Sequence, residues 1–268
     1  APMPPPPSIA VAGASALGRG LNRRWFFRHA DGAGNNGDLI DRLLWARGIQ
    51  ATERDAFLRG ALTDVERPWE RPDLMASASA LLEALRAGRS IAIYGDYDVD
   101  GITSTAILWH AARAIEPGAR LRTYVPHRID EGYGLNAEAI RSLAAEGIEF
   151  VITVDCGVTA VAEATLAREL GVELVITDHH RPREDGVLPD ARAIAHPSLP
   201  GREHRFTECC GAAVAWKLAW GLFDLVAGSP EGHRLPAILR DTLSSLLPLA
   251  AIGTIADVMP LVGENRAI

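Results

Sequence analysis

From residue 90 onward the sequence alternates short apolar segments with helix-like segments, and this alternation limits the folds that the chain can adopt. Five apolar segments have the length and composition of strands: 91–94, 121–125, 150–154, 174–177 and 192–195. Between the first four, the spacing of apolar residues predicts helices near 102–115, 136–146 and 159–170. Strands that alternate with crossover helices form a parallel sheet. The sequence therefore predicts an α/β fold, a parallel β-sheet with helices on both faces.

The chain before this alternation has a different texture. Residues 1–20 are rich in Pro, Ala and Gly without periodicity, and they predict a flexible leader. Residues 21–88 predict a small helical segment, and residues 89–268 the main domain, which turns mainly helical after Glu208. Arg and aromatic residues interleave in 21–30, a mix that can stack on bases but more often belongs to a packed amphipathic segment.

Two details of the helical segment can be predicted. Leucines recur at helical spacing at Leu39, Leu43 and Leu44, and a further apolar stripe covers 74–85. Thr52 is a candidate cap for a short helix that runs through Leu58.

Composition bounds the function. The three cysteines include no CxxC pair, which argues against a disulfide framework and for a reducing compartment. The sequence contains no apolar run of membrane-span length and no secretion signal, so we expect a cytoplasmic protein without a membrane anchor. The net charge of −7 argues against a nucleic-acid binder, unless many of the acids cluster around metal ions.

Three aspartates at alternate positions, Asp96, Asp98 and Asp100, follow the first strand of the main domain. In extended backbone these side chains would share one face, and carboxylates that close repel unless they are protonated or hold a cation. Gly101 then opens a predicted helix whose N-terminus would favour an anion such as phosphate. The alternative is a solvated acidic loop.

Two further strands end in similar residues. Asp155 follows the strand at 150–154, and Asp178, His179 and His180 follow the strand at 174–177. Ligands of open parallel sheets bind outside the carboxyl ends of the strands, so these groups should meet in one crevice. Singly, Asp155 could be a helix N-cap, Asp178 a turn former and His179 a hydrogen-bonded polar residue.

Carboxylates with one or two imidazoles and no thiolates suit Mn²⁺ or Mg²⁺ better than structural zinc. Enough ligands for two ions would allow a two-metal arrangement, which indicates phosphoester hydrolysis. Asp257 stands alone in an apolar stretch, where it either caps a turn or completes the metal cage.

The ordered motifs GDYDVDG, TVDCG, TDHH and GTIADVMPL closely resemble those of the DHH phosphoesterase family. YVPHRIDEGYGLN, CGAAVAWKL and GENR also agree, and the resemblance runs from about Trp25 to the end of the chain. It implies that two ions of Mn²⁺ or Mg²⁺ are held by Asp98, Asp100, Asp155, His179 and Asp257, with Asp155 as the bridge.

The resemblance also implies roles for four neighbouring residues. Asp96 would either bind a metal ion or hold the ligands in place without binding it, and Asp178 would orient its neighbours. His180 would face the scissile phosphate, and Arg128 would contact phosphate or be an ordinary surface Arg.

The activity implied by the resemblance is a metal-dependent single-stranded-DNA exonuclease that works from the 5′ end in recombination and repair. Candidate partners are single-stranded DNA, a single-strand-binding protein and a helicase. Alternatives are a phosphoesterase of short oligonucleotides or cyclic dinucleotides, and a non-catalytic replication scaffold.

The sequence departs from the family pattern in two places. His196 stands before Pro197 where Asn is expected, and it would either touch the site or form the turn. The chain stops at Ile268, where we expect the family to continue into a DHH-associated domain and an OB-fold, so this chain would be the metal-binding half and could be inactive alone.

Overall fold

The computed structural model describes residues 16–19, 24–26, 38–201, 204–228 and 235–268. The chain divides into two compact units, 1–59 and 60–268, each described by itself. Most of the predicted leader and most of the Arg-rich aromatic segment lie outside the described residues.

The first unit contains short elements. Strands β1 (Ala16–Arg19) and β2 (Arg24–Phe26) pair antiparallel. Helix α1 (Leu39–Trp45) coincides with the predicted leucine pattern, and Asp38 caps it by accepting a hydrogen bond from the Asp41 N–H at 2.8 Å. The prediction for Thr52 is wrong. A 3₁₀ turn, Ala51–Glu53, contains this residue and leads directly into α2 (Arg54–Arg59), so Thr52 lies inside the turn and caps nothing.

The second unit is built on the predicted sheet. Its strands are β3 (Ile91–Tyr94), β4 (Leu121–Tyr124), β5 (Phe150–Val154), β6 (Glu173–Thr177) and β7 (Ala193–Ala195). They lie in the order β4-β3-β5-β6-β7, and every pair is parallel. The predicted α/β fold class is confirmed.

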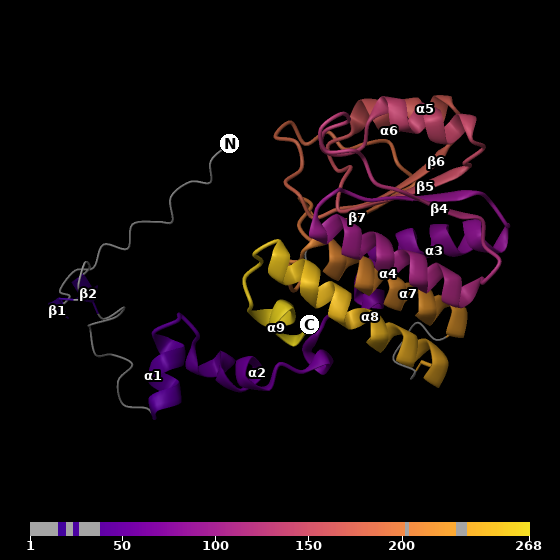
Figure 1. Ribbon diagram of the computed structural model, residues 1–268. Coiled ribbons are helices and arrows are strands. Elements are labelled where there is room, and N and C mark those ends of the chain that lie inside the picture. The colour runs from indigo at the N-terminus through magenta and orange to yellow at the C-terminus, as the bar shows by residue number, and fades with distance from the viewer. Residues whose placement is uncertain (1–15, 20–23, 27–37, 202–203, 229–234) are drawn as a thin grey trace. The chain divides into compact units, whose positions relative to one another are not determined.

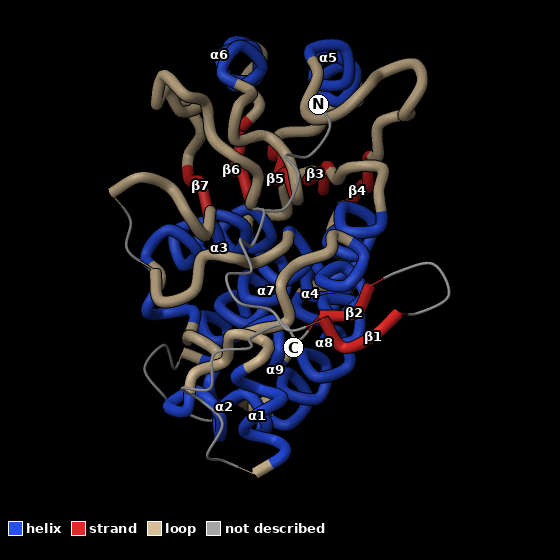
Figure 2. The backbone as a smooth tube through the Cα atoms, turned by 90° about the vertical axis from the view of Figure 1, so that its left-hand side faces the viewer, coloured by secondary structure: helices blue, strands red, loops and turns tan. Residues whose placement is uncertain are grey.

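Helices cover both faces of this sheet (Figures 1 and 2). Helices α3 (Pro72–Arg86), α4 (Val99–Ile115) and α7 (Gly211–Ala227) pack on one face, and α8 (Ala237–Ala256) packs along α4 and α7. Helices α5 (Ala137–Ala145) and α6 (Val161–Glu169) cover the other face. The 3₁₀ turns Leu62–Asp64 and Pro68–Glu70 begin this unit, and the short α9 (Gly263–Ala267) ends it. Helix α3 came from the predicted helical segment, yet it lies in the unit that contains the sheet.

A separate hydrophobic core lies on each face of the sheet, between the sheet and the helices that cover it. Successive side chains of a strand point alternately into one core and the other. Ile91 and Ile93 of β3 enter the core beneath α3, α4 and α7, whereas Ala92 and Tyr94 enter the core beneath α5 and α6. This period of two is that of a strand buried on both faces, which explains why the strand sequences are continuously apolar.

Strand order reverses between β3 and β5. The connection through α4 leads from β3 to its neighbour β4, and the chain then crosses back to β5 on the other side of β3. In open α/β sheets, ligands bind where the crossovers diverge in this way, which here is at the carboxyl ends of β3 and β5. The fold therefore predicts where a ligand site would lie.

Among the described residues one helix, α8, is long and apolar enough to cross a membrane by length and composition. The sequence prediction found no apolar run of membrane-span length, and this helix does contain two charged residues, Arg240 and Asp241. The helix packs against α4 and α7. Its packing is that of a helix in a globular domain.

Candidate metal centre

The three aspartates after β3 do not share one extended face, so that part of the sequence prediction is wrong. Asp98 is the N-cap of α4 and accepts a hydrogen bond from the Gly101 N–H at 2.9 Å, and the helix begins at Val99 rather than near 102. Asp100 thus lies in the first helical turn. The reason is the capping preference of Asp, which starts the helix one residue after Asp98.

Helix entry nevertheless keeps Asp96 close to the site. A Cβ atom on Gly101 would lie 2.5 Å from the Asp96 carbonyl oxygen and 2.6 Å from its backbone nitrogen. Only glycine allows the first turn of α4 to pack this tightly on the loop that follows β3. Asp96 is buried, and its Oδ1 has no hydrogen-bond partner.

Asp155 lies at the end of β5 with a left-handed backbone, φ 62°. It does not cap a helix, because α6 begins only at Val161. The side chain is 1% exposed, and neither carboxylate oxygen has a hydrogen-bond partner. Helix α7 begins directly against it, since a Cβ atom on Gly211 would lie 2.6 Å from the Asp155 Oδ1.

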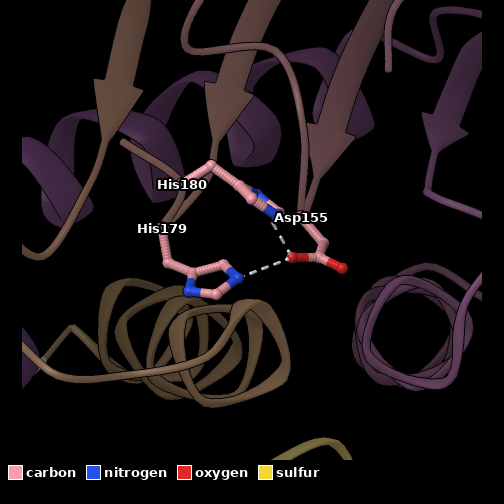
Figure 3. Close-up of side chains that lie close together, drawn as sticks. All are labelled: Asp155, His179 and His180. Atoms are coloured by element: carbon pink, nitrogen blue, oxygen red, sulfur yellow. Dashed lines mark ion pairs between the residues drawn. The ribbon is translucent and has the colours of Figure 1, made fainter. Parts of the chain in front are cut away.

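The turn after β6 brings two imidazoles to Asp155 (Figure 3). His179 Nε2 lies 3.1 Å from the Asp155 Oδ1, and His180 Nδ1 lies 3.8 Å from the same oxygen. Asp178 holds this turn: its carboxylate accepts hydrogen bonds from the backbone N–H groups of Val158, His179 and His180, at 2.8, 2.7 and 3.0 Å. Its Oδ1 also lies 2.8 Å from His180 Nδ1.

Helices α7 and α8 close the opposite side of the centre. The backbone N–H groups of Gly211 and Ala212, at the N-terminus of α7, donate to the two oxygens of Asp100 at 2.6 and 2.8 Å. Asp257 ends α8 as its C-cap, and its Oδ2 lies 3.7 Å from His179 Nε2. The Oδ2 of Asp100 lies 3.7 Å from the same nitrogen.

The predicted ligands therefore converge. Three overlapping groups have ligand atoms within 4.8 Å of one another: Asp96 with Asp98 and Asp155; Asp155 with His179 and His180; and Asp100 with His179 and Asp257. Asp155 and His179 each belong to two of the groups, so they lie at the middle of the cluster. Arg128 lies outside these groups on an exposed loop, with its guanidinium carbon 5.1 Å from the centre of the Tyr97 ring.

Burial and crowded charge shift the pKa values in this cluster. Burial, with the nearby Asp100 carboxylate, raises the pKa of Asp155 strongly, and burial also raises the pKa of Asp96 and of Asp257. Burial alone would lower the pKa of His180, but its hydrogen bond with Asp178 raises it. The carboxylates are therefore crowded in a place that disfavours their charge unless a cation is present.

The donor set fits a hard divalent cation. Asp96 Oδ1, both Asp155 oxygens and His179 Nε2 are buried atoms without a hydrogen-bond partner, which is costly unless another group binds them. Neighbouring ligand atoms of a compact octahedral ion lie about 3 Å apart, close to the 3.1 Å between His179 and Asp155. Carboxylates and imidazole without thiolate favour Mn²⁺ or Mg²⁺ over structural zinc.

Sequence reasoning missed several residues that shape the centre. Tyr133 lies with its hydroxyl 2.9 Å from His180 Nδ1. Gly211 and Gly253 let α7 and α8 approach, since a Cβ atom on Gly253 would lie 2.5 Å from the Asp100 Oδ1. Glycine inside a predicted helix signals close packing, but the sequence did not reveal which group approaches it.

The fold and the candidate centre together define an α/β protein with a buried carboxylate–histidine cluster at the carboxyl ends of its parallel strands. Residues 90–254 match the sequence profile described as the DHH family, N-terminal domain, and the chain belongs to this family.

Known relatives are similar over most of the chain. The single-stranded-DNA-specific exonuclease RecJ of Bacillus subtilis is 42% identical over 231 residues, 86% of this chain and 27% of the relative. RecJ of Escherichia coli is 34% identical over 250 residues, 92% of this chain and 42% of the relative. The chain thus spans about a quarter to two fifths of the length of these curated relatives.

Two solved structures are similar in fold. A crystal structure of exonuclease RecJ bound to manganese superposes with a TM-score of 0.62 at 39% identity, over 74% of this chain and 46% of that one. RecJ of Thermus thermophilus in complex with Mn²⁺ gives a TM-score of 0.64 at 34% identity, over 85% of this chain and 30% of that one.

Proposed function

We propose that this chain is the metal-binding half of a Mn²⁺- or Mg²⁺-dependent phosphodiesterase that degrades single-stranded DNA from its 5′ end. The observation that carries the proposal is the convergence of buried ligand atoms of Asp96, Asp155 and His179, none with a hydrogen-bond partner, at the carboxyl ends of the strands. The similarity to RecJ single-stranded-DNA-specific exonucleases supports the substrate class. A place in recombination and repair is part of the proposal.

The proposed ligands divide between two ions. One end of the cluster contains Asp98 and Asp155, and Asp96 lies there as a third ligand or as a support of these two. The other end contains Asp100, His179 and Asp257. Asp155 would bridge the two ions. When bound, the ions supply a water activated for attack and neutralise charge on the phosphoryl oxygens.

The residues around the ligands hold the geometry and bind the phosphate. Asp178 fixes both histidines by accepting hydrogen bonds from their two backbone N–H groups, and it is itself held by the Val158 N–H. Its hydrogen bond with the His180 ring favours the protonated form of that histidine. His180 keeps its Nδ1 on Asp178, which leaves its Nε2 to donate to a phosphoryl oxygen where negative charge develops. Arg128 is exposed beside Tyr97 and would bind phosphate from the loop after β4.

We also propose the remaining context. Residues 1–20 would form a leader and 21–88 a helical lead-in to a phosphoesterase domain at 89–268. The protein would act in the cytoplasm with a single-strand-binding protein and a helicase. The acidic net charge of −7 would then reflect the metal ligands, with much of the DNA grip supplied from outside this chain.

The test is hydrolysis of 5′-labelled single-stranded DNA with Mn²⁺, beside a dinucleotide substrate. Asp155→Asn should abolish cleavage, whereas Asp241→Asn, the same change at an exposed residue of α8, should leave it intact. Metal-dependent release of mononucleotides from the long strand supports the proposal. Cleavage of the dinucleotide alone would favour a short-oligonucleotide phosphoesterase. A chain that neither binds Mn²⁺ nor cleaves would favour the non-catalytic scaffold.

A further inference from the structure

The turn after β7 reaches the metal centre through a buried histidine. His196 is fully buried, its Nε2 lies 2.7 Å from the His180 carbonyl oxygen, and its Nδ1 lies 3.1 Å from the Ser198 backbone nitrogen. The Ser198 N–H can only donate, so Nδ1 accepts. The proton must then reside on Nε2, which donates to the His180 carbonyl.

A buried polar network holds the backbone of His196. Its backbone N–H donates to Asp73 Oδ2 at 3.0 Å, and its carbonyl accepts from Arg71 Nη2 at 3.1 Å. Arg71 and Asp73 form an ion pair at 3.3 Å, and both side chains are buried. The turn is thus attached to the start of α3, an element that contributes none of the proposed ligands.

The His180 carbonyl has few other means of support. After β6 the chain runs without helix or strand until β7, over 178–192. At the start of this segment, the Asp178 N–H donates a hydrogen bond to the Ala195 carbonyl at 3.1 Å, and the Asp178 carboxylate holds the turn. Two residues later, within the described chain, the His196 ring is the group that bonds the His180 carbonyl. That carbonyl belongs to the 180–181 peptide, so its orientation acts directly on His180 and, through the preceding peptide, on His179.

We propose that His196 is a positioning residue that fixes the His179–His180 turn through its hydrogen bond to the His180 carbonyl. An Asn side chain, expected here from the family pattern, ends closer to the backbone than the imidazole Nε2. It could not donate to the same carbonyl unless the turn moved. His196 therefore combines both alternatives left open by the sequence: it forms the turn and it supports the site.

The test uses three variants of the whole chain. His196→Gln places an amide donor near the position of Nε2, and His196→Met has an unbranched side chain of a length similar to that of Gln but no donor. Leu199→Ala is the matched control, because Leu199 is buried in the same turn but belongs to the core beneath α5 and α6. It should lower stability without changing the support of the site.

Two readouts separate positioning from stability. In ¹⁵N-histidine-labelled, metal-free protein, the ring signals of His179 and His180 should shift in His196→Met and stay near their wild-type positions in His196→Gln and Leu199→Ala. The Mn²⁺ dissociation constant should rise about 10- to 100-fold in His196→Met, the usual cost of losing a group that supports a ligand. It should change little in the other two variants.

The activity arm rests on the proposed function and should show a fall in kcat with little change in KM for His196→Met. Failure of the wild type to bind Mn²⁺ would count against the proposed function, and the ring signals would then decide the positioning role alone. The inference is overturned if His196→Met leaves the ring signals unchanged. It is also overturned if Leu199→Ala shifts them as much, because loss of stability would then explain the effect.

Discussion

Asp155→Asn should stabilise the metal-free protein while removing its metal site. Asp155 is 1% exposed, and neither oxygen has a hydrogen-bond partner. Burial, followed by repulsion from Asp100, raises its pKa to about 10, with Asp98 and Asp178 adding to the repulsion and His180 opposing it. Without a cation, the ionised carboxylate is therefore a cost to the folded state that an amide does not carry.

The sign and size of the effect follow from proton binding. An unfolded Asp ionises near pH 4, whereas the folded state retains the Asp155 proton to a much higher pH, so the folded state binds more protons in between. The free energy of unfolding must then fall as the pH rises, by about 1.4 kcal/mol per pH unit for one proton. Between about pH 6 and pH 8 the wild type should lose up to about 2.7 kcal/mol through this group.

The assay is urea unfolding with EDTA at both pH values, for the wild type, Asp155→Asn and the control Asp241→Asn. The stability advantage of Asp155→Asn should grow with pH, and the control should follow the wild type. Mn²⁺ at about 100 times its dissociation constant should then add about 2.7 kcal/mol per bound ion to the wild type and little to Asp155→Asn. An advantage that stays constant with pH, or equal stabilisation of both proteins by Mn²⁺, would refute the reasoning.

Three other predictions follow from individual contacts. Gly211→Ala places a Cβ atom 2.6 Å from the Asp155 Oδ1. Thermal unfolding should show a loss of about 1–3 kcal/mol of stability, and calorimetry should show no Mn²⁺ binding. Normal Mn²⁺ binding would mean that α7 can move away from Asp155. Lys217→Met leaves the buried Glu264 without its ion-pair partner. Urea unfolding should show that the free energy of unfolding falls by about 3–5 kcal/mol. An unchanged free energy would mean that Glu264 becomes protonated at little cost. Asp178→Asn weakens the backbone bonds that hold the histidines and should reduce Mn²⁺ affinity about 10- to 100-fold; unchanged affinity would assign the turn to other supports.

Much of the sheet could be predicted because strands buried on both faces have continuous apolar sequences. Ile91–Tyr94 and Phe150–Val154 are such strands, and their predicted bounds match those of β3 and β5. The position of the site followed from the predicted parallel sheet and from polar residues at strand ends, since parallel strands end at the same edge. Local capping was less predictable, because Asp98 could either extend the loop or start α4, and the packed structure determined which.

Contacts between distant segments were not predictable from the sequence. The N–H groups of α7 hold Asp100 across 111 and 112 residues of sequence, and the α8 glycine Gly253 packs on the same carboxylate. Gly211 at the start of α7 and Gly253 in α8 carry no side-chain functional group that would signal these roles. His196 was noticed only as a departure from the family pattern, and its bond to the His180 carbonyl required the arrangement of β6 and β7.

A calorimetric titration of the metal-free chain with Mn²⁺ tests directly whether the buried carboxylates form a metal centre. We expect two ions per chain for the wild type and for Asp241→Asn, and loss of both sites in Asp155→Asn because Asp155 would bridge the ions. An absence of Mn²⁺ binding by the wild type, or unchanged binding by Asp155→Asn, would contradict a metal centre built on the buried oxygens of Asp155.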